Sequence, residues 1–277
     1  ILYRLGAVVR YNVIKKDEEI LIPGESFSTD NQQNATIARI ISRCAQFKFP
    51  TSNISDFITY TSEKNKYNPV QTWIDSSPWD GEDRLTGFLD TVKPKEEQSL
   101  KNGELLHHAL IKRWMVSAIA SALSPNGISS AGVLVFQGGQ GLGKTKWFKS
   151  LVPDELDLTK DGLQLRLDDK DSVKEALSYW LVELGELDGT FNKSEMAALK
   201  AFLTKSSDEM RQAYARKASK FARRTVFFAS VNPDKFLKDS TGNRRYWTIA
   251  CESIDYNHTF NMQQVWAQVL ALYKSGY

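Results

Sequence analysis

Runs of consecutive apolar residues and apolar stripes at helical spacing alternate along the second part of the chain. Apolar runs cover residues 132–137, 179–184 and 225–231, and a shorter one covers 245–249. Uninterrupted runs of this kind are typical of strands that are buried on both faces of a sheet. The pattern therefore predicts four core strands in this part of the chain.

Helical stripes lie before, between and after these runs. Over residues 104–123, apolar side chains recur at helical spacing on one face, and further helices are expected at 171–177, 192–203 and 262–273. Strands that alternate with helices favour an α/β fold with a mostly parallel sheet flanked by helices.

The N-terminal part has a different pattern. The first 24 residues resemble a hairpin, and helical stripes follow at 34–47 and 54–65. The polar segment 93–103 is typical of a linker. We therefore expect a small N-terminal α/β to helical domain over 1–100 and a larger domain over 101–277.

Composition constrains the class of protein. Hydrophobic residues make up 42% of the chain and charged residues 25%, as in an ordinary globular protein. No apolar run approaches the ~20 residues of a membrane span, and no signal peptide is found. Cys44 and Cys251 lack metal-ligand spacing, so reduced thiols in the cytosol are expected. Because the chain starts at Ile1 rather than Met, we expect a part of something longer.

Residues 138–145, Gly-Gly-Gln-Gly-Leu-Gly-Lys-Thr, match the pattern G-x-x-x-x-G-K-[ST] of loops that hold nucleotide phosphates. A predicted strand precedes them and a helical segment follows, as the motif requires. Lys144 would reach the β- and γ-phosphates, and the Thr145 hydroxyl would bind Mg²⁺. ATP or GTP with Mg²⁺ is thus the expected ligand. The predicted binding residues are Gly139, Gln140, Gly141, Leu142, Gly143, Lys144 and Thr145.

Acidic and amide side chains follow the next two predicted strands. Glu183 stands near the end of the first, Glu186 and Asp188 come shortly after it, and Asn232 follows the second. Ligands of parallel α/β sheets bind outside the carboxyl ends of the strands, so Glu183 should face the γ-phosphate. We assign Glu183 to the Mg²⁺ side and Glu186 to the attacking water. The two roles are interchangeable because Gly185 separates the acids. Asn232 would contact the γ-phosphate and orient the water.

Two basic features complete the candidate chemistry. Arg244 and Arg245 stand at the entrance to the last predicted strand and suit phosphate or transition-state charge. One hypothesis is an arginine finger that reaches a neighbouring subunit's ATP, and plain surface arginines are the alternative. A basic segment between residues 205 and 224 contains aromatic residues, which suits single-stranded nucleic acid, although a solvated loop is the alternative. Its candidate DNA-binding residues are Lys205, Arg211, Tyr214, Arg216, Lys217 and Lys220. His107 and His108 lack partners in the sequence and are expected to be structural.

The order of these motifs resembles the virulence-associated protein E family. The likeness rests on the loop at 138–145, on Trp180-Leu-Val-Glu-Leu-Gly-Glu-Leu187, on Asp208-Glu-Met-Arg211 with Tyr214, and on Thr241-Gly-Asn-Arg-Arg-Tyr-Trp247. Upstream, Pro78-Trp-Asp-Gly81 is similar to the family's lead-in region. The likeness covers roughly residues 60 to 277.

This family is found on bacteriophages and genomic islands and resembles superfamily 3 helicases among the AAA+ ATPases. The resemblance implies a homo-oligomeric ring, expected to be hexameric, with ATP between subunits, in the cytosol of a bacterial host. It implies Asn232 as the sensor, Arg244 or Arg245 as a finger acting in trans, and a DNA-contacting hairpin at the basic segment. The separation of Glu183 from Glu186 departs from the adjacent carboxylates of such enzymes.

The sequence therefore predicts an Mg²⁺-dependent ATPase that acts as a ring-forming DNA helicase or translocase in replication of a phage or mobile element, with single-stranded DNA as its partner. The alternative is an assembly switch, in which ATP drives binding to DNA or a host protein without processive unwinding. A P-loop kinase is disfavoured, because no second-substrate site or arginine-rich lid follows the loop.

Overall fold

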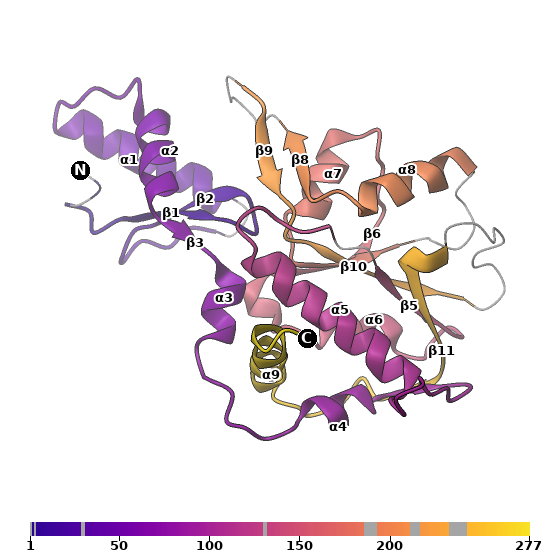
Figure 1. The fold of residues 1–277 in the computed structure, drawn as a ribbon. Helices are drawn as coiled ribbons and strands as arrows, with labels where there is room; N and C mark the ends of the chain where they lie inside the picture. The colour runs from indigo at the N-terminus through magenta and orange to yellow at the C-terminus, as the bar shows by residue number, and fades with distance from the viewer. Residues whose placement is uncertain are drawn as a thin grey trace. The chain divides into compact units, whose positions relative to one another are not determined.

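The computed structural model describes residue 2 and residues 4–28, 31–129, 132–185, 193–210, 217–232 and 243–277 (Figure 1). Two compact units divide the chain, Ile1–Pro69 and Val70–Tyr277. The sequence placed the boundary near residue 100, whereas the contacts in the structure divide the chain after Pro69.

The N-terminal unit is a small α/β unit. Strands β1 (Val8–Asn12) and β2 (Asp17–Leu21) form an antiparallel hairpin, and β3 (Lys66–Tyr67) pairs with β1 in parallel. Helices α1 (Gln32–Gln46) and α2 (Ile54–Lys64) supply most of the core, because Ile40, Cys44 and Ile58 pack against Val9. The hairpin and both helices match the sequence pattern.

The larger unit is built on a six-stranded sheet in the order β4-β11-β5-β10-β7-β6. Its strands are β4 (Val92–Pro94), β5 (Val133–Gln137), β6 (Thr159–Leu163), β7 (Leu181–Leu184), β10 (Val226–Val231) and β11 (Tyr246–Ile254). Neighbouring strands from β11 to β6 pair in parallel, and the edge strand β4 pairs with β11 antiparallel. Strands β8 (Ser207–Met210) and β9 (Ser219–Ala222) form a separate antiparallel hairpin.

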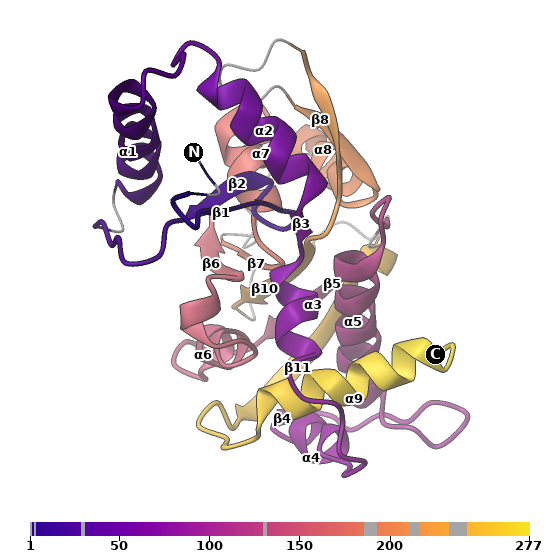
Figure 2. The same cartoon turned by 90° about the vertical axis from the view of Figure 1, so that its left-hand side faces the viewer.

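Helices cover both faces of this sheet, which explains why its central strands β5, β7 and β10 are buried along almost their whole length. The helices are α3 (Pro69–Ile74), α4 (Leu85–Leu89), α5 (Leu106–Leu123), α6 (Lys144–Lys149), α7 (Lys170–Leu177), α8 (Lys193–Leu203) and α9 (Met262–Lys274), with short 3₁₀ turns at Asp154–Leu156 and Asn243–Arg245. Figure 2 shows α5 and α9 side by side, and these two helices are in contact.

The core behind α5, α6 and α9 is rich in aromatic rings. Trp114, Trp147, Trp180 and Trp266 are fully buried, and each indole N–H donates to an oxygen within 3 Å. Buried tryptophans need such partners because an unpaired N–H away from water is costly. On the other face, residues of α7 and α8 pack on alternate positions of β5, β7 and β10.

Residues 70–105 belong to the larger unit because α9 binds their backbone. The Gln268 Oε1 accepts from the amides of Arg84 and Leu85 at 3.0 and 2.9 Å, and the Gln264 Oε1 accepts from the amide of Asp80 at 3.1 Å. These side chains are mostly buried, so their bonds hold the segment firmly. No helix among the described residues is long and apolar enough to cross a membrane.

Candidate nucleotide site

The loop between β5 and α6 carries the phosphate-binding motif at the carboxyl end of the sheet. Gly141 and Gly143 have φ of +87° and +84°, in the left-handed region that favours glycine. A Cβ on Gly143 would lie 1.9 Å from Cδ1 of Tyr256, so the ring leaves no room for a side chain there. Both the backbone conformation and the neighbouring ring therefore require glycine at residue 143.

Lys144 begins α6 and reaches back across this loop. Its Nζ donates to the carbonyl oxygens of Gly138 and Gly139 at 2.7 and 2.8 Å. These two bonds fix the ammonium group at the open side of the loop. The position suits a charge-assisted bond to a phosphate oxygen.

Glu183 on β7 lies directly beside the loop. The Glu183 Oε1 accepts from the Thr145 hydroxyl at 2.8 Å and from the Ser230 hydroxyl at 2.6 Å. The residue is only 2% exposed, and its Oε2 has no hydrogen-bond partner among the described residues. A buried carboxylate oxygen without a partner is costly unless a cation neutralises it.

The oxygen donors at this point fit a magnesium ion. Mg²⁺ prefers carboxylate and hydroxyl oxygens together with water and phosphate ligands. Thr145 and Glu183 supply one oxygen of each protein type, and the unpartnered Glu183 Oε2 has no other described function. The residues present therefore fit the predicted cation.

A pocket of about 360 Å³ opens over these groups. It has a volume within the usual range of small-ligand sites. Its lining residues are Gln140, Gly141, Gly143, Lys144, Thr145, Lys146, Ser230, Asn232 and Tyr256. Of the residues chosen from sequence, the structure thus brings together five loop residues and Asn232 around one pocket, with Glu183 beneath it.

Arg244 and Arg245 lie at the amino-terminal end of β11, whereas the loop lies at the carboxyl ends of the parallel strands. They immediately precede Tyr246, which is paired with Val133 at the start of β5, whereas the loop follows the end of β5 at Gln137. Five strand residues span roughly 17 Å. The structure therefore does not bring either arginine to the pocket of its own chain.

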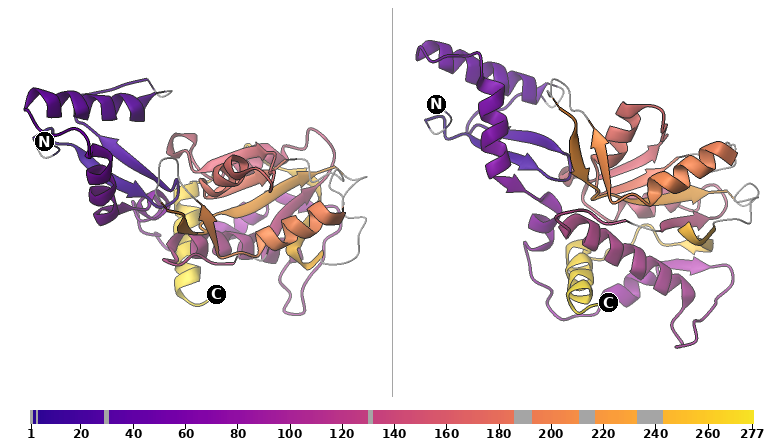
Figure 3. Two further views of the ribbon diagram at one scale, coloured as in Figure 1. Left: turned by 90° about the horizontal axis from the view of Figure 1, so that it is seen from above. Right: turned by 45° about the horizontal axis from the view of Figure 1, so that its top comes forward.

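The basic segment forms the hairpin β8–β9, which stands apart from the main sheet (Figure 3). Lys217 and Lys220 are exposed on its second half, and exposed Lys205 precedes its first strand with Nζ 3.8 Å from a carboxylate oxygen of Asp208. The three described candidate lysines thus remain accessible to a polyanion.

Arg223 is an exception within this basic segment, because it is buried at the base of the hairpin. Its Nε and Nη2 donate to Asp208 Oδ2 at 3.0 and 2.6 Å, and its Nη1 donates to the carbonyl of Phe202. Burial lowers the pKa of Arg223, and the Asp208 carboxylate opposes that shift. Arg223 therefore anchors the hairpin and is not available to nucleic acid, contrary to its place in the sequence-derived basic segment.

Comparison with known proteins identifies the family. Residues 74–277 match the model of the virulence-associated protein E-like domain, which is most of the chain. The chain belongs to the virulence-associated protein E-like family. No curated protein matches it.

The solved structures to which this virulence-associated protein E-like chain is similar share little sequence with it. The apo C-terminal region of NrS-1 is 15% identical with a TM-score of 0.46, over all of this chain and 68% of that one. A second apo form of that region is 13% identical with a TM-score of 0.43, over 99% of this chain and 65% of that one. An inhibitor-bound JCV helicase is 11% identical with a TM-score of 0.38, over 74% of this chain and 54% of that one.

Three pocket residues of the virulence-associated protein E-like domain were not identified from sequence: Lys146, Ser230 and Tyr256. Ser230 stands two residues before Asn232 and could have been found, since alternate residues of a strand share a face. Tyr256 gives no such signal, because it follows β11 and reaches the loop only through the strand order.

Four sequence-derived candidates, Glu186, Arg211, Tyr214 and Arg216, lie outside the described residues. Their predicted functions in this virulence-associated protein E-like chain stay predictions.

Proposed function

We propose that this chain is the motor domain of a helicase-like protein: an Mg²⁺-dependent P-loop ATPase of the AAA+, superfamily 3 type. The observation that carries the proposal is the group formed by Lys144, Thr145, Glu183 and Ser230 at the phosphate loop. Family membership supports the phage-type, helicase-like setting.

The chain's own residues suggest how ATP would be bound and cleaved. Loop N–H groups and the Lys144 ammonium would bind the β- and γ-phosphates, while Thr145 and Glu183 would hold Mg²⁺. When bound, Mg²⁺ would neutralise charge on the transferred phosphoryl group. Asn232, exposed at the end of β10, would orient the attacking water from the far side of the pocket. Glu186 remains the candidate base for that water, and its role is interchangeable with that of Glu183.

The arginines fit a role in a neighbouring copy. Because Arg244 and Arg245 lie a strand length from their own loop, a finger would have to reach the ATP of the next subunit. This geometry supports the proposed homo-oligomeric ring, of which a hexamer is the expected form. The exposed lysines of the β8–β9 hairpin would contact single-stranded DNA, and hydrolysis would move that strand during replication of a phage or mobile element in the bacterial cytosol.

The first test is ATP turnover with and without single-stranded DNA. We expect Mg²⁺-dependent turnover that DNA stimulates, and we expect Lys144→Ala and Glu183→Gln to lower it by roughly two orders of magnitude or more. Lys149→Ala is the matched control and should leave turnover unchanged, since this exposed lysine lies on α6 outside the pocket.

If single-stranded DNA does not change ATP turnover and the protein does not unwind a forked duplex, the assembly switch would be favoured. Full turnover in Lys144→Ala would contradict the ATPase assignment itself.

A further inference from the structure

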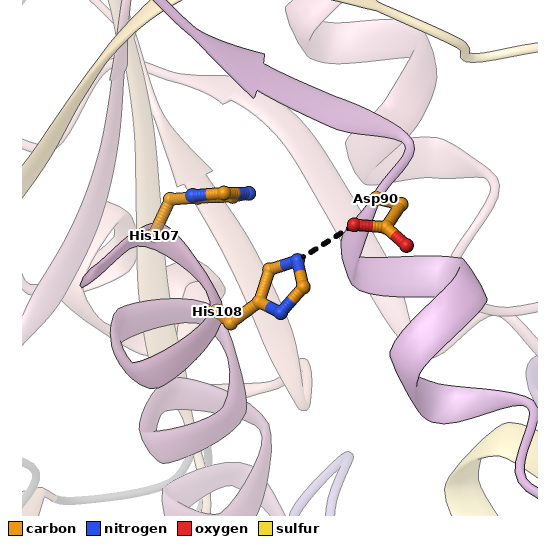
Figure 4. A group of neighbouring side chains, drawn as sticks. All are labelled: Asp90, His107 and His108. Carbon is orange, nitrogen blue, oxygen red and sulfur yellow. Dashed lines mark hydrogen bonds and ion pairs between the residues drawn. The ribbon is translucent and has the colours of Figure 1, made fainter. Parts of the chain in front are cut away.

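A second group of ligand-bearing side chains lies at the junction of α4 and α5, apart from the phosphate loop. Asp90 follows α4, and His107 and His108 stand in the first turn of α5. One potential ligand atom from each residue lies within 4.8 Å of the other two. Figure 4 shows both imidazole rings, from consecutive residues, facing the Asp90 carboxylate.

The backbone around these residues is held in place on both sides. The amide of Leu106 donates to the carbonyl of Gln98 at 2.7 Å, which fixes the start of α5. Next to Asp90, the Thr91 hydroxyl donates to the Phe88 carbonyl and accepts from the Trp147 indole at 2.8 Å. Phe88 stacks on Trp147, with ring centroids 5.3 Å apart. The ligands therefore come from packed elements rather than from a free loop.

His107 has no hydrogen-bond partner that would explain its burial. The residue is only 5% exposed, and its Nδ1 has no partner among the described residues. Burial, followed by the nearby His108, lowers the pKa of His107, which disfavours the charged form of the ring. Neutral imidazole is the form that binds metals.

The other two residues complete a donor set with an open side. The His108 Nε2 lies 2.9 Å from Asp90 Oδ1, and the Asp90 side chain is 59% exposed. An ion could thus enter from solvent and replace the contact between His108 and Asp90. Two imidazole nitrogens and one carboxylate oxygen suit zinc and its neighbours, whereas Mg²⁺ and Ca²⁺ prefer oxygen alone.

We propose that Asp90, His107 and His108 form a binding site for a divalent transition-metal ion of the zinc class, with a fourth position left to water. The ion joins the end of α4 to the start of α5. Its ligand Asp90 directly precedes Thr91 in the chain. The Thr91 hydroxyl accepts a hydrogen bond from the indole of Trp147, which belongs to the phosphate-loop helix α6. The site therefore stiffens the structure behind the nucleotide pocket.

The test is a titration of the metal-free protein with Zn²⁺ alone, followed by Co²⁺ as an optical probe. We expect one ion per chain, visible cobalt absorption, and a higher Tm with Zn²⁺, because a ligand of the folded state stabilises it. In His108→Ala and in Asp90→Asn, affinity should fall by at least about tenfold, and the rise in Tm should vanish.

Three controls separate this site from others. The chain has three histidines, so His258→Gln tests the only one outside the group, and Asp154→Asn removes an exposed carboxylate elsewhere. Glu183→Gln disables the proposed Mg²⁺ site and should leave zinc affinity unchanged. All three variants should bind like wild type.

Circular dichroism without metal shows whether the variants fold. Folded His108→Ala and Asp90→Asn proteins that bind Zn²⁺ as tightly as wild type would overturn the proposal, and so would a wild type that shows no cobalt absorption. Loss of zinc binding in Glu183→Gln would assign the ion to the phosphate loop instead.

Discussion

Two glycines of the phosphate loop, Gly139 and Gly143, differ in how strongly the structure requires glycine at their positions. Gly143 has a left-handed backbone conformation, and the ring of Tyr256 occupies the space that a Cβ would need. Gly139 has no positive φ, and no other atom lies within 4 Å of the position that its Cβ would take. Two glycines of one motif are thus under different structural demands. Gly143 preserves the loop's shape, whereas nothing near Gly139 would obstruct a side chain there.

This difference predicts that alanine lowers stability at residue 143 but not at residue 139. Gly143→Ala should lower the free energy of unfolding by about 1–3 kcal/mol, because the backbone is strained and Tyr256 must move. Gly139→Ala is the matched control and should change stability by less than about 0.5 kcal/mol. Denaturant unfolding without nucleotide measures both. Equal stability of the two variants would contradict the role given to Tyr256.

The phosphate loop, Glu183 and Asn232 could be selected from sequence because each is contiguous with an apolar strand or follows one directly. Tyr256, and the partnership of Asp90 with the two histidines, could not. Asp90 lies 18 residues from His108, and the intervening segment must fold back before they meet. The burial of Arg223 could not be predicted either, since a basic residue in a basic segment gives no sign of its burial.

At the level of elements, the β8–β9 hairpin depends on one buried ion pair. Arg223 has a side chain with no exposure, and both of its contacts to Asp208 use the same oxygen. Its backbone amide also donates to Ser206 at 2.9 Å, so the residue links the two strands at their base. The contacts of Arg223 at the base of the hairpin therefore fix the hairpin's position, and the exposed lysines take no part in this.

Removing one partner of this pair should be strongly destabilising. Arg223→Ala leaves the buried Asp208 carboxylate alone, and we expect a loss of about 3–5 kcal/mol of unfolding free energy. The double variant Arg223→Met, Asp208→Leu should recover much of that loss, because apolar residues of similar volume can replace a buried pair. Lys220→Ala on the same hairpin is the control and should be nearly neutral. Additive losses in the double variant would refute the coupling.

The exposed part of the hairpin should affect DNA rather than stability. Lys217→Ala with Lys220→Ala should keep basal ATP turnover but weaken stimulation by single-stranded DNA. If both lysines contact phosphates, the dependence of log affinity on log salt should flatten by about 0.7 for each lost contact. A double variant of Lys101 and Lys174, two exposed lysines outside the hairpin, is the control. An unchanged salt slope would remove the hairpin from the DNA interface.

At the scale of the whole molecule, the fold class can be predicted from the alternation of strands and helices in the sequence. The division of the chain into two units cannot be predicted in this way. The polar segment 93–103 resembles a linker, yet β4 within it extends the main sheet at Lys93 and Pro94. The glutamines of α9 that bind residues 80–85 lie about two-thirds of the chain away in sequence and carry no local signal. The polar segment thus begins with residues of the main sheet, and the contacts that hold the region are long-range.

The separation of arginines and loop predicts complementation between inactive variants. Lys144→Ala and an Arg244→Ala, Arg245→Ala double variant should each lack turnover alone. Mixed in equal amounts, they should restore about a quarter of wild-type turnover, because that share of head-to-tail interfaces joins an intact loop to an intact arginine pair. Activity of the arginine variant alone would show that neither arginine is needed. No recovery on mixing, with assembly intact, would contradict action in trans.

The register of β11 with β5, which keeps the arginines away from their own loop, also bears on the form of the proposed assembly. In the proposed ring, each copy would present its arginines to the loop of the next copy, so every interface would join two different surfaces. In such a head-to-tail arrangement, all copies would point the same way around the ring. An open, linear oligomer would then have one catalytic junction fewer than it has chains. Only a closed ring would pair every phosphate loop with the arginines of a neighbouring chain. Closure of the proposed ring would thus add the final active junction. The two rims of such a ring would differ, which would give a passing strand a defined direction.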